Sequence, residues 1–167
     1  VLPDSRGLSD PQMQNIAREF NFSETAFVFP PEQGQTKKVR IYTPTTEVPF
    51  AGHPTVGAAF ILAQNGEFGK IDKPFKIGFE QKAGVVQVDI RYDSDNRICC
   101  ELEAPEKLMI GDPVPKHLIA STLSIRELDI VTTTHPPQTA SVGLPFIFVE
   151  LASLSALQQA EINRPEL

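Results

Sequence analysis

Two side chains of this sequence have the type and setting that proton transfer requires, Glu24 and His53. Glu24 begins an otherwise apolar or small run that ends at Phe29. A carboxylate held against apolar neighbours is costly to ionise, and such a group can take up and return a proton near neutral pH. The alternative is an ordinary solvated carboxylate at the end of a strand, and the residues by themselves favour that alternative.

His53 lies between Gly52 and Pro54, in a run that predicts a sharp turn from a strand into a helix. Gly52 can adopt backbone angles closed to other residues, and Pro54 loses nothing in a first helical turn, where its missing N–H would be unpaired. The free amides and positive dipole end of a helix starting near Thr55 would suit a carboxylate or phosphate. His53 would either assist that anion or make a structural hydrogen bond to a carbonyl, and the sequence leaves both readings open.

These residues must be positioned by helices and strands. Residues 54–65 are nearly all helix formers, which predicts a helix buried on most of its circumference and closed by a left-handed residue at Gly66. Ser9 and Gln12 predict a capping box at the start of another helix, which runs to about Glu19. Alternating or apolar runs predict five strands, at residues 24–29, 39–43, 75–80, 84–91 and 97–103.

The order of these elements, mostly that of a meander, indicates an α+β fold. The proline-rich stretch from Pro105 to Pro115 has no periodicity and predicts a domain boundary, so we divide the chain into residues 1–110, which carry Glu24 and His53, and residues 111–167. The later part predicts shorter elements: a helix at 117–123, strands at 129–133 and 143–151, and a helix capped by Ser153.

Charge and composition argue against several classes of function. The net charge is -6 and the fifteen Lys and Arg residues are scattered, so we expect no nucleic-acid partner. No apolar run approaches the ~20 residues of a transmembrane helix, and no basic leader with an apolar segment opens the chain. We therefore expect a soluble, cytoplasmic protein with no membrane association.

Metal, thiol and serine chemistry are not expected either. Cys99 and Cys100 are adjacent on a predicted strand and so point to opposite faces, which suits neither a disulfide nor a shared metal site. His117 and His135 have no acidic or thiol neighbours at ligand spacing, so we assign no metal. The run Ser141-Val142-Gly143 does not match a nucleophile elbow, which argues against a serine hydrolase.

Three stretches closely resemble the PhzF-like family, the phenazine-biosynthesis isomerases, which are similar in fold to diaminopimelate epimerase and proline racemase. The stretches are residues 8–27 with the motif Ser23-Glu24-Thr25, residues 39–44, and residues 49–55 with the motif Gly52-His53-Pro54. The similarity is dense from residue 8 to residue 65 and looser to residue 167, where Gly143-Leu144-Pro145-Phe146 resembles the opening of the family's second domain.

The resemblance implies a diaminopimelate epimerase-like fold, with two similar halves that each wrap a curved, mostly antiparallel sheet around a central helix. The helix at 54–65 would be the central helix of the first half, and the active site would lie between the halves. The family's opening strand would precede Val1, and its Asp-Pro-Ala-Thr-Gly-Ser motif is not found in this sequence, so the second half would be incomplete. The resemblance also implies a homodimer.

The activity that the resemblance implies is cofactor-free proton transfer on a small carboxylate metabolite, as in an isomerase or epimerase. The family's acid/base glutamate falls on Glu24, and the histidine of its Gly-His-Pro motif falls on His53, so both are expected to be catalytic. We expect Gly52, Pro54 and Thr55 to bind the substrate, without a metal.

Diaminopimelate epimerases carry a cysteine at the corner that corresponds to Ala51-Gly52, and its absence argues against two-thiol racemase chemistry. Two other functions remain as alternatives. One is a non-catalytic protein that binds small anions at the same corner, and the other is a domain kept for protein association.

Overall fold

The computed structural model describes residues 1–163. The chain divides into two compact units, Val1–Pro105 and Glu106–Leu167, each with its own group of buried apolar side chains. The proline-rich stretch in which the sequence predicts a boundary begins where the first unit ends. None of the described helices is long and apolar enough to cross a membrane.

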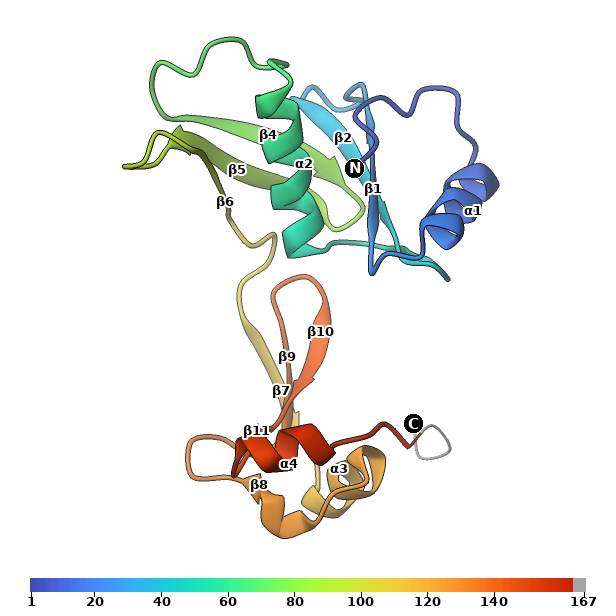
Figure 1. The fold of residues 1–167 in the computed structure, drawn as a ribbon, viewed down its shortest axis with the longest axis vertical. Coiled ribbons are helices and arrows are strands. Elements are labelled where there is room, and N and C mark those ends of the chain that lie inside the picture. The colour runs from blue at the N-terminus through green and yellow to red at the C-terminus, as the bar shows by residue number, and fades with distance from the viewer. Residues whose placement is uncertain (164–167) are drawn as a thin grey trace. The chain divides into compact units, whose positions relative to one another are not determined.

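The first unit is built on a six-stranded, mostly antiparallel sheet (Figure 1). Its main path runs β1-β2-β4-β5-β6, with β3 paired to β2, and β2 and β4 run parallel. The strands are β1 (Thr25–Phe29), β2 (Lys37–Tyr42), β3 (Glu47–Val48), β4 (Phe75–Gln81), β5 (Gly84–Tyr92) and β6 (Ile98–Leu102). This confirms the five predicted strands, with ends within two residues of the predicted ones, whereas the short β3 was not predicted.

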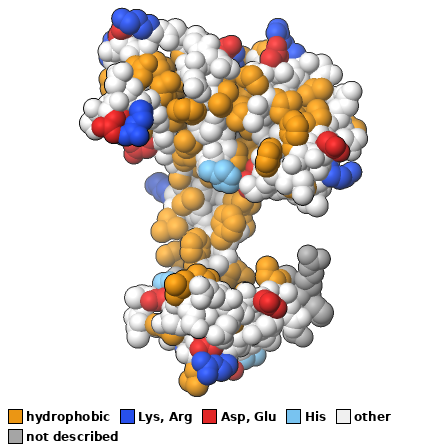
Figure 2. Space-filling model, viewed as in Figure 1, with side chains coloured by type: hydrophobic (Ala, Val, Ile, Leu, Met, Phe, Trp, Pro, Cys, Tyr) orange, Lys and Arg blue, Asp and Glu red, His pale blue; other side chains and the backbone are white. Residues whose placement is uncertain are grey.

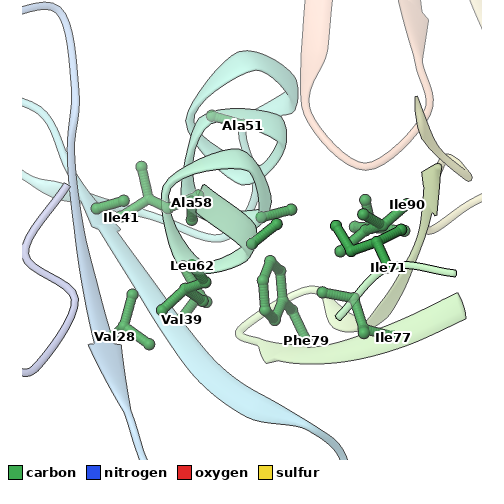
Figure 3. Close-up of a cluster of buried hydrophobic side chains, with 14 residues drawn as sticks. Val28, Val39, Ile41, Ala51, Ala58, Leu62, Ile71, Ile77, Phe79 and Ile90 are labelled. Carbon is green, nitrogen blue, oxygen red and sulfur yellow. The ribbon is translucent and has the colours of Figure 1, made fainter. Parts of the chain in front are cut away.

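Helix α2 (Gly52–Gln64) packs on one face of this sheet. Figure 3 shows side chains of β1 and β2 on one side of the helix and side chains of β4 and β5 on the other. The buried residues of α2 are Pro54, Thr55, Ala58, Ala59, Leu62 and Ala63, and Leu62 is the one large side chain among them. Because small side chains allow a close approach, strands from both halves of the sheet can contact one helix.

The start of α2 differs from the prediction, whereas its end agrees with it. The helix begins at Gly52, three residues before the predicted start near Thr55. Gly66 has a φ of +75°, which confirms the predicted left-handed cap. Phe60 is exposed, because it lies about 100° around the helix from the buried Ala59.

Helix α1 (Asp10–Phe20) covers the other face of β1. It lies where the sequence predicts a helix. Met13 and Ala17 pack with Phe27, while the neighbouring strand residues Ala26 and Val28 face α2. Strand β1 is therefore buried on both faces. Buried side chains on both faces fix the strand, and with it the residue that precedes it.

The loop between β1 and β2 is fastened to β4 by a buried carboxylate. Glu80 accepts hydrogen bonds from the backbone N–H groups of Glu32, Gln33 and Gln35, at 2.7, 2.6 and 3.2 Å. Burial by itself raises the pKa of Glu80, but these bonds outweigh burial and lower the pKa. The loop is thus held by charge-assisted hydrogen bonds.

The second unit contains short elements and two small sheets, β10-β9-β7 and β11-β8. Its strands are β7 (Met109–Pro113), β8 (Ile130–Val131), β9 (Gln138–Ser141), β10 (Pro145–Phe148) and β11 (Glu150–Leu151). Its helices are α3 (Lys116–Leu123), a 3-10 turn at Glu127–Asp129 and α4 (Leu154–Gln159). The predicted helix at 117–123 and the cap at Ser153, whose Oγ accepts from the Ala156 N–H, are confirmed. Strands β7 and β9 were not predicted.

The β10-β9-β7 sheet exposes large apolar side chains, visible along it in Figure 2. Phe146, Ile147 and Phe148 of β10 and Met109 and Ile110 of β7 are all exposed. Successive strand residues point to opposite faces, so both faces of this sheet carry apolar surface. The core of the second unit instead gathers around Ile119, Ala120 and Ile130.

Candidate active site

Glu24 stands directly before β1, whose pairing with β2 holds the backbone that follows it. The next residue, Thr25, pairs with Tyr42 of β2 and is buried. The side chain of Glu24 is 20% exposed. It is therefore neither fully solvated nor fully buried, the two alternatives considered from the sequence. Its Oε2 atom is buried and has no hydrogen-bond partner among the described residues. A buried carboxylate oxygen without a partner is uncommon in a purely structural role.

The corner at residues 51–54 is the start of α2 itself. Ala51 is the N-cap in an extended conformation, so Gly52, His53 and Pro54 are the first three residues of the helix. Gly52 does not use the positive φ angles that glycine allows, and a Cβ atom there would meet only the Leu102 side chain at 3.9 Å. The prediction that this glycine is needed for its backbone angles is therefore wrong for this corner.

The structure brings the two predicted catalytic side chains together. His53 Nε2 lies 2.9 Å from Glu24 Oε2, although the alignment is not that of a hydrogen bond. The His53 side chain is 74% exposed and so reaches the carboxylate from the solvent side. An acidic and a basic group in contact can pass a proton between them or to a substrate.

Two backbone amides next to this pair have no partner among the described residues, those of Gly52 and His53. Pro54 has no N–H, and the N–H of Thr55 donates to the Ala51 carbonyl at 3.3 Å. Free amides at a helix N-terminus point outward together with the positive end of the dipole. The arrangement can therefore hold a carboxylate beside Glu24 and His53.

The predicted substrate-binding residues take different positions in this turn. Gly52 offers its free amide, whereas Pro54 and Thr55 are buried. The Thr55 hydroxyl donates to the Ala51 carbonyl at 2.7 Å and accepts from Gln81 Nε2 at 2.8 Å. Sequence reasoning missed Gln81, because nothing in the pattern of β4 sets this strand-end glutamine apart.

Charged side chains fasten the segment that leads into α2. Arg40 of β2 pairs with Glu47 of β3 through two N–H···O contacts of 2.8 and 2.9 Å, and it also pairs with Asp10 of α1. Hydrogen bonds to these two carboxylates raise the pKa of Arg40. Glu47 thus anchors the segment that leads into the corner by a bidentate pair.

Other groups named from the sequence are not part of this pair. The two cysteines are free thiols on β6, and burial, with a smaller effect of Cys99, raises the pKa of Cys100 to about 11. Within residues 1–163 no group of three or more His, Cys, Asp or Glu side chains is placed to hold a metal ion. His117 and His135 belong to the second unit.

Comparison with known proteins agrees with this picture. A family model for phenazine biosynthesis-like proteins, PhzC-PhzF, matches residues 1–167. An uncharacterized isomerase of Pasteurella multocida is 36% identical over 165 residues, 98% of this chain and 52% of that protein. The trans-2,3-dihydro-3-hydroxyanthranilate isomerase of Pseudomonas aeruginosa is 32% identical over 157 residues, 94% of this chain and 52% of that enzyme. The chain spans about half the length of these relatives.

Solved structures show the same fold. A predicted epimerase of Pseudomonas aeruginosa, 25% identical, superposes with a TM-score of 0.82 over 96% of this chain and 55% of its own. A hydroxyproline epimerase from Agrobacterium vitis, 10% identical, shares the fold with a TM-score of 0.60 over 94% of this chain and 42% of its own. The expected diaminopimelate epimerase-like α+β fold is confirmed. Since the family model spans the entire sequence and the fold agrees with it, this chain belongs to the PhzC-PhzF family of phenazine biosynthesis-like proteins.

Proposed function

We propose that this chain carries the acid/base pair and one carboxylate-binding site of a PhzF-type isomerase. The observation that carries the proposal is the 2.9 Å contact between Glu24 Oε2 and His53 Nε2, next to two unpaired amides. The curated relatives named as isomerases support it, because they match almost the whole chain at 32–36% identity. The proposed substrate is a small carboxylic acid.

In the proposed reaction the substrate carboxylate accepts hydrogen bonds from the Gly52 and His53 amides at the start of α2. The Glu24 carboxylate then removes a proton from a nearby carbon of the substrate and returns one to another position, which leaves the number of protons unchanged. Glu24 Oε2 suits this task because it makes no hydrogen bond among the described residues and lies in contact with His53. His53 contacts the same oxygen and can stabilise its charged form or donate a proton.

The other residues of the turn act through its geometry. Pro54 removes a competing donor, and Thr55 holds the helix start from the buried side. No cofactor or metal takes part in this proposal. Proton transfer between carbon atoms needs a base, an acid and stabilisation of the developing charge, which side chains and amides can supply.

Solvent exchange tests the proposal directly. The full-length protein is incubated with trans-2,3-dihydro-3-hydroxyanthranilate, the substrate named for the Pseudomonas relative, in deuterated water, and deuterium in the recovered molecule is measured by NMR. We expect incorporation by the unmodified chain and a loss of about 10²–10⁴-fold in Glu24→Gln, the usual contribution of one acid/base group. Glu19→Gln, an exposed carboxylate of α1, is the matched control and should leave the rate unchanged. Equal exchange in Glu24→Gln and the unmodified chain would remove Glu24 from its role.

The alternative is a non-catalytic protein that binds small anions with the same helix start, and the strong exposure of His53 favours it as the second candidate. Calorimetry with acetate separates the two functions. A binder should hold acetate equally well in Glu24→Gln and show no deuterium exchange in any variant. A domain kept only for protein association should show neither acetate binding nor any effect of changes at Glu24 or His53.

A cytoplasmic location and a homodimer complete the proposal. The location was expected from the sequence and the homodimer from the family resemblance, and each stays a prediction. Equilibrium sedimentation of the purified chain measures the second of them.

A further inference from the structure

The buried side of the α2 start contains a chain of hydrogen bonds that the proposed chemistry does not use. Gln81, the last residue of β4, donates from Nε2 to the Thr55 hydroxyl at 2.8 Å. That hydroxyl donates in turn to the Ala51 carbonyl at 2.7 Å. The donors and acceptors in this series of hydrogen bonds are fixed. A threonine hydroxyl has one proton, which it donates to the carbonyl, so the glutamine must donate from its NH₂ group.

This series of hydrogen bonds ends on the Ala51 carbonyl, whose direction determines the orientation of the proposed anion-binding amide of Gly52. Ala51 O accepts both the Thr55 hydroxyl and the Thr55 N–H, at 2.7 and 3.3 Å. The Ala51 carbonyl and the Gly52 N–H belong to the same planar peptide group and point in opposite directions. Whatever fixes the direction of Ala51 O therefore also fixes the direction of the free Gly52 N–H.

A second contact comes from the same turn of the sheet. Directly after β4, the N–H of Ala83 donates to the carbonyl of Pro49 at 3.0 Å, two residues before Ala51. The end of β4 and the turn after it thus contact both the first turn of α2 and the segment leading into it. Gln81 keeps its place even though its Oε1 atom is buried without a hydrogen-bond partner among the described residues. A buried polar atom without a hydrogen-bond partner destabilises the folded state. Packing by itself therefore does not account for a glutamine at this position.

We propose that Gln81 is a positioning residue of the carboxylate site. Through Thr55 and the Ala51 carbonyl it sets the direction of the Gly52 N–H, and it does so without touching the substrate. The role of that N–H in binding rests on the proposed function, whereas its orientation can be measured by itself. Gln81 is therefore expected to matter for the alignment of one hydrogen bond and little for the rest of the fold.

The test measures the orientation of the Gly52 N–H as a residual dipolar coupling in the ¹⁵N-labelled 167-residue chain. Gln81→Leu removes the donor, and Thr55→Val removes the hydroxyl while nearly keeping its shape. Thr55→Ser keeps the hydroxyl, and Gln87→Leu changes a glutamine of the neighbouring strand that is partly exposed like Gln81. We expect the coupling of Gly52 to change in the first two variants and to stay in the last two.

Affinity for acetate, followed by the Gly52 amide shift, gives the functional readout. We expect a loss of about tenfold in Gln81→Leu and in Thr55→Val, the size of one misaligned hydrogen bond. If the chain with its native Gln81 does not bind acetate, the proposed function fails, but the couplings still decide the role of Gln81. An unchanged Gly52 coupling in a folded Gln81→Leu chain overturns the proposal. If Gln81→Leu does not fold, the contrast between Thr55→Val and Thr55→Ser decides in the same way.

Discussion

Replacing Gly52 by alanine separates two explanations for a glycine at the start of α2. The sequence suggests a need for unusual backbone angles, but Gly52 lies in the first helical position with ordinary angles. A Cβ atom there would meet Leu102 at 3.9 Å, an ordinary van der Waals distance. Alanine should therefore fit without strain, and it should stabilise the chain by restricting its unfolded state.

The size of the effect follows from that mechanism. A compatible Gly→Ala change stabilises by about 0.4–1 kcal/mol. For a unit of 105 residues this corresponds to a rise of about 2–8 °C in the midpoint of thermal unfolding. Gly66→Ala is the matched control at the other end of the same helix, where φ is +75°. A left-handed alanine costs about 1–2 kcal/mol, so this variant should unfold at a lower temperature.

Tyrosine fluorescence is the suitable probe. The sequence has no tryptophan, and its two tyrosines, Tyr42 and Tyr92, both lie in the first unit. The signal therefore reports the unit that carries Gly52. A midpoint for Gly52→Ala that falls as far as the midpoint of Gly66→Ala would refute the reasoning, because it would show that the corner needs glycine for its backbone.

Two further predictions concern ionisable groups away from the helix start. The pKa of Glu80 lies below its ordinary value of 4.5 in the folded chain, so its contribution to stability is present above pH 4.5 and is lost as the pH falls through the folded-state pKa. The gap in urea midpoint between the unmodified chain and Glu80→Gln should thus be constant above about pH 5 and close on acidification, and an equally wide gap in strong acid would contradict this. With its pKa raised to about 11, Cys100 should react with Ellman's reagent slowly at about pH 8. In Cys99→Ser the remaining thiol should therefore be the slow one, and fast labelling of that variant would be the contrary result.

The sequence predicted most of the first unit because local and tertiary preferences agree there. In β5 the residues Val86, Val88 and Ile90 alternate with polar ones, and all three are fully buried. The start of α2 was placed too late, since Gly52 and Pro54 resemble a helix break when hydrogen bonds from the sheet are unknown. Strand β9 (Gln138–Ser141) was missed because Thr139 is its one β-branched residue and it has no aromatic residue.

The candidate site was less accessible to reasoning from the residues. The sequence separates Glu24 from His53 by a hairpin and a further strand, so no periodicity relates the two side chains. Composition by itself favoured a solvated Glu24, and only the family resemblance paired it with His53. Neither composition nor the family resemblance indicated Gln81, because its hydrogen bond to Thr55 joins the end of a strand to the buried side of a helix.

The missing N–H of Pro54 has a consequence for selectivity. With Thr55 N–H committed to Ala51, the first turn of α2 offers two neighbouring donors, from Gly52 and His53, and no third. A planar carboxylate has two oxygens and can satisfy both donors at once. A sulfate or phosphate has more oxygens than this turn has free amides, so in the proposed site the proline leaves part of such an anion without a donor.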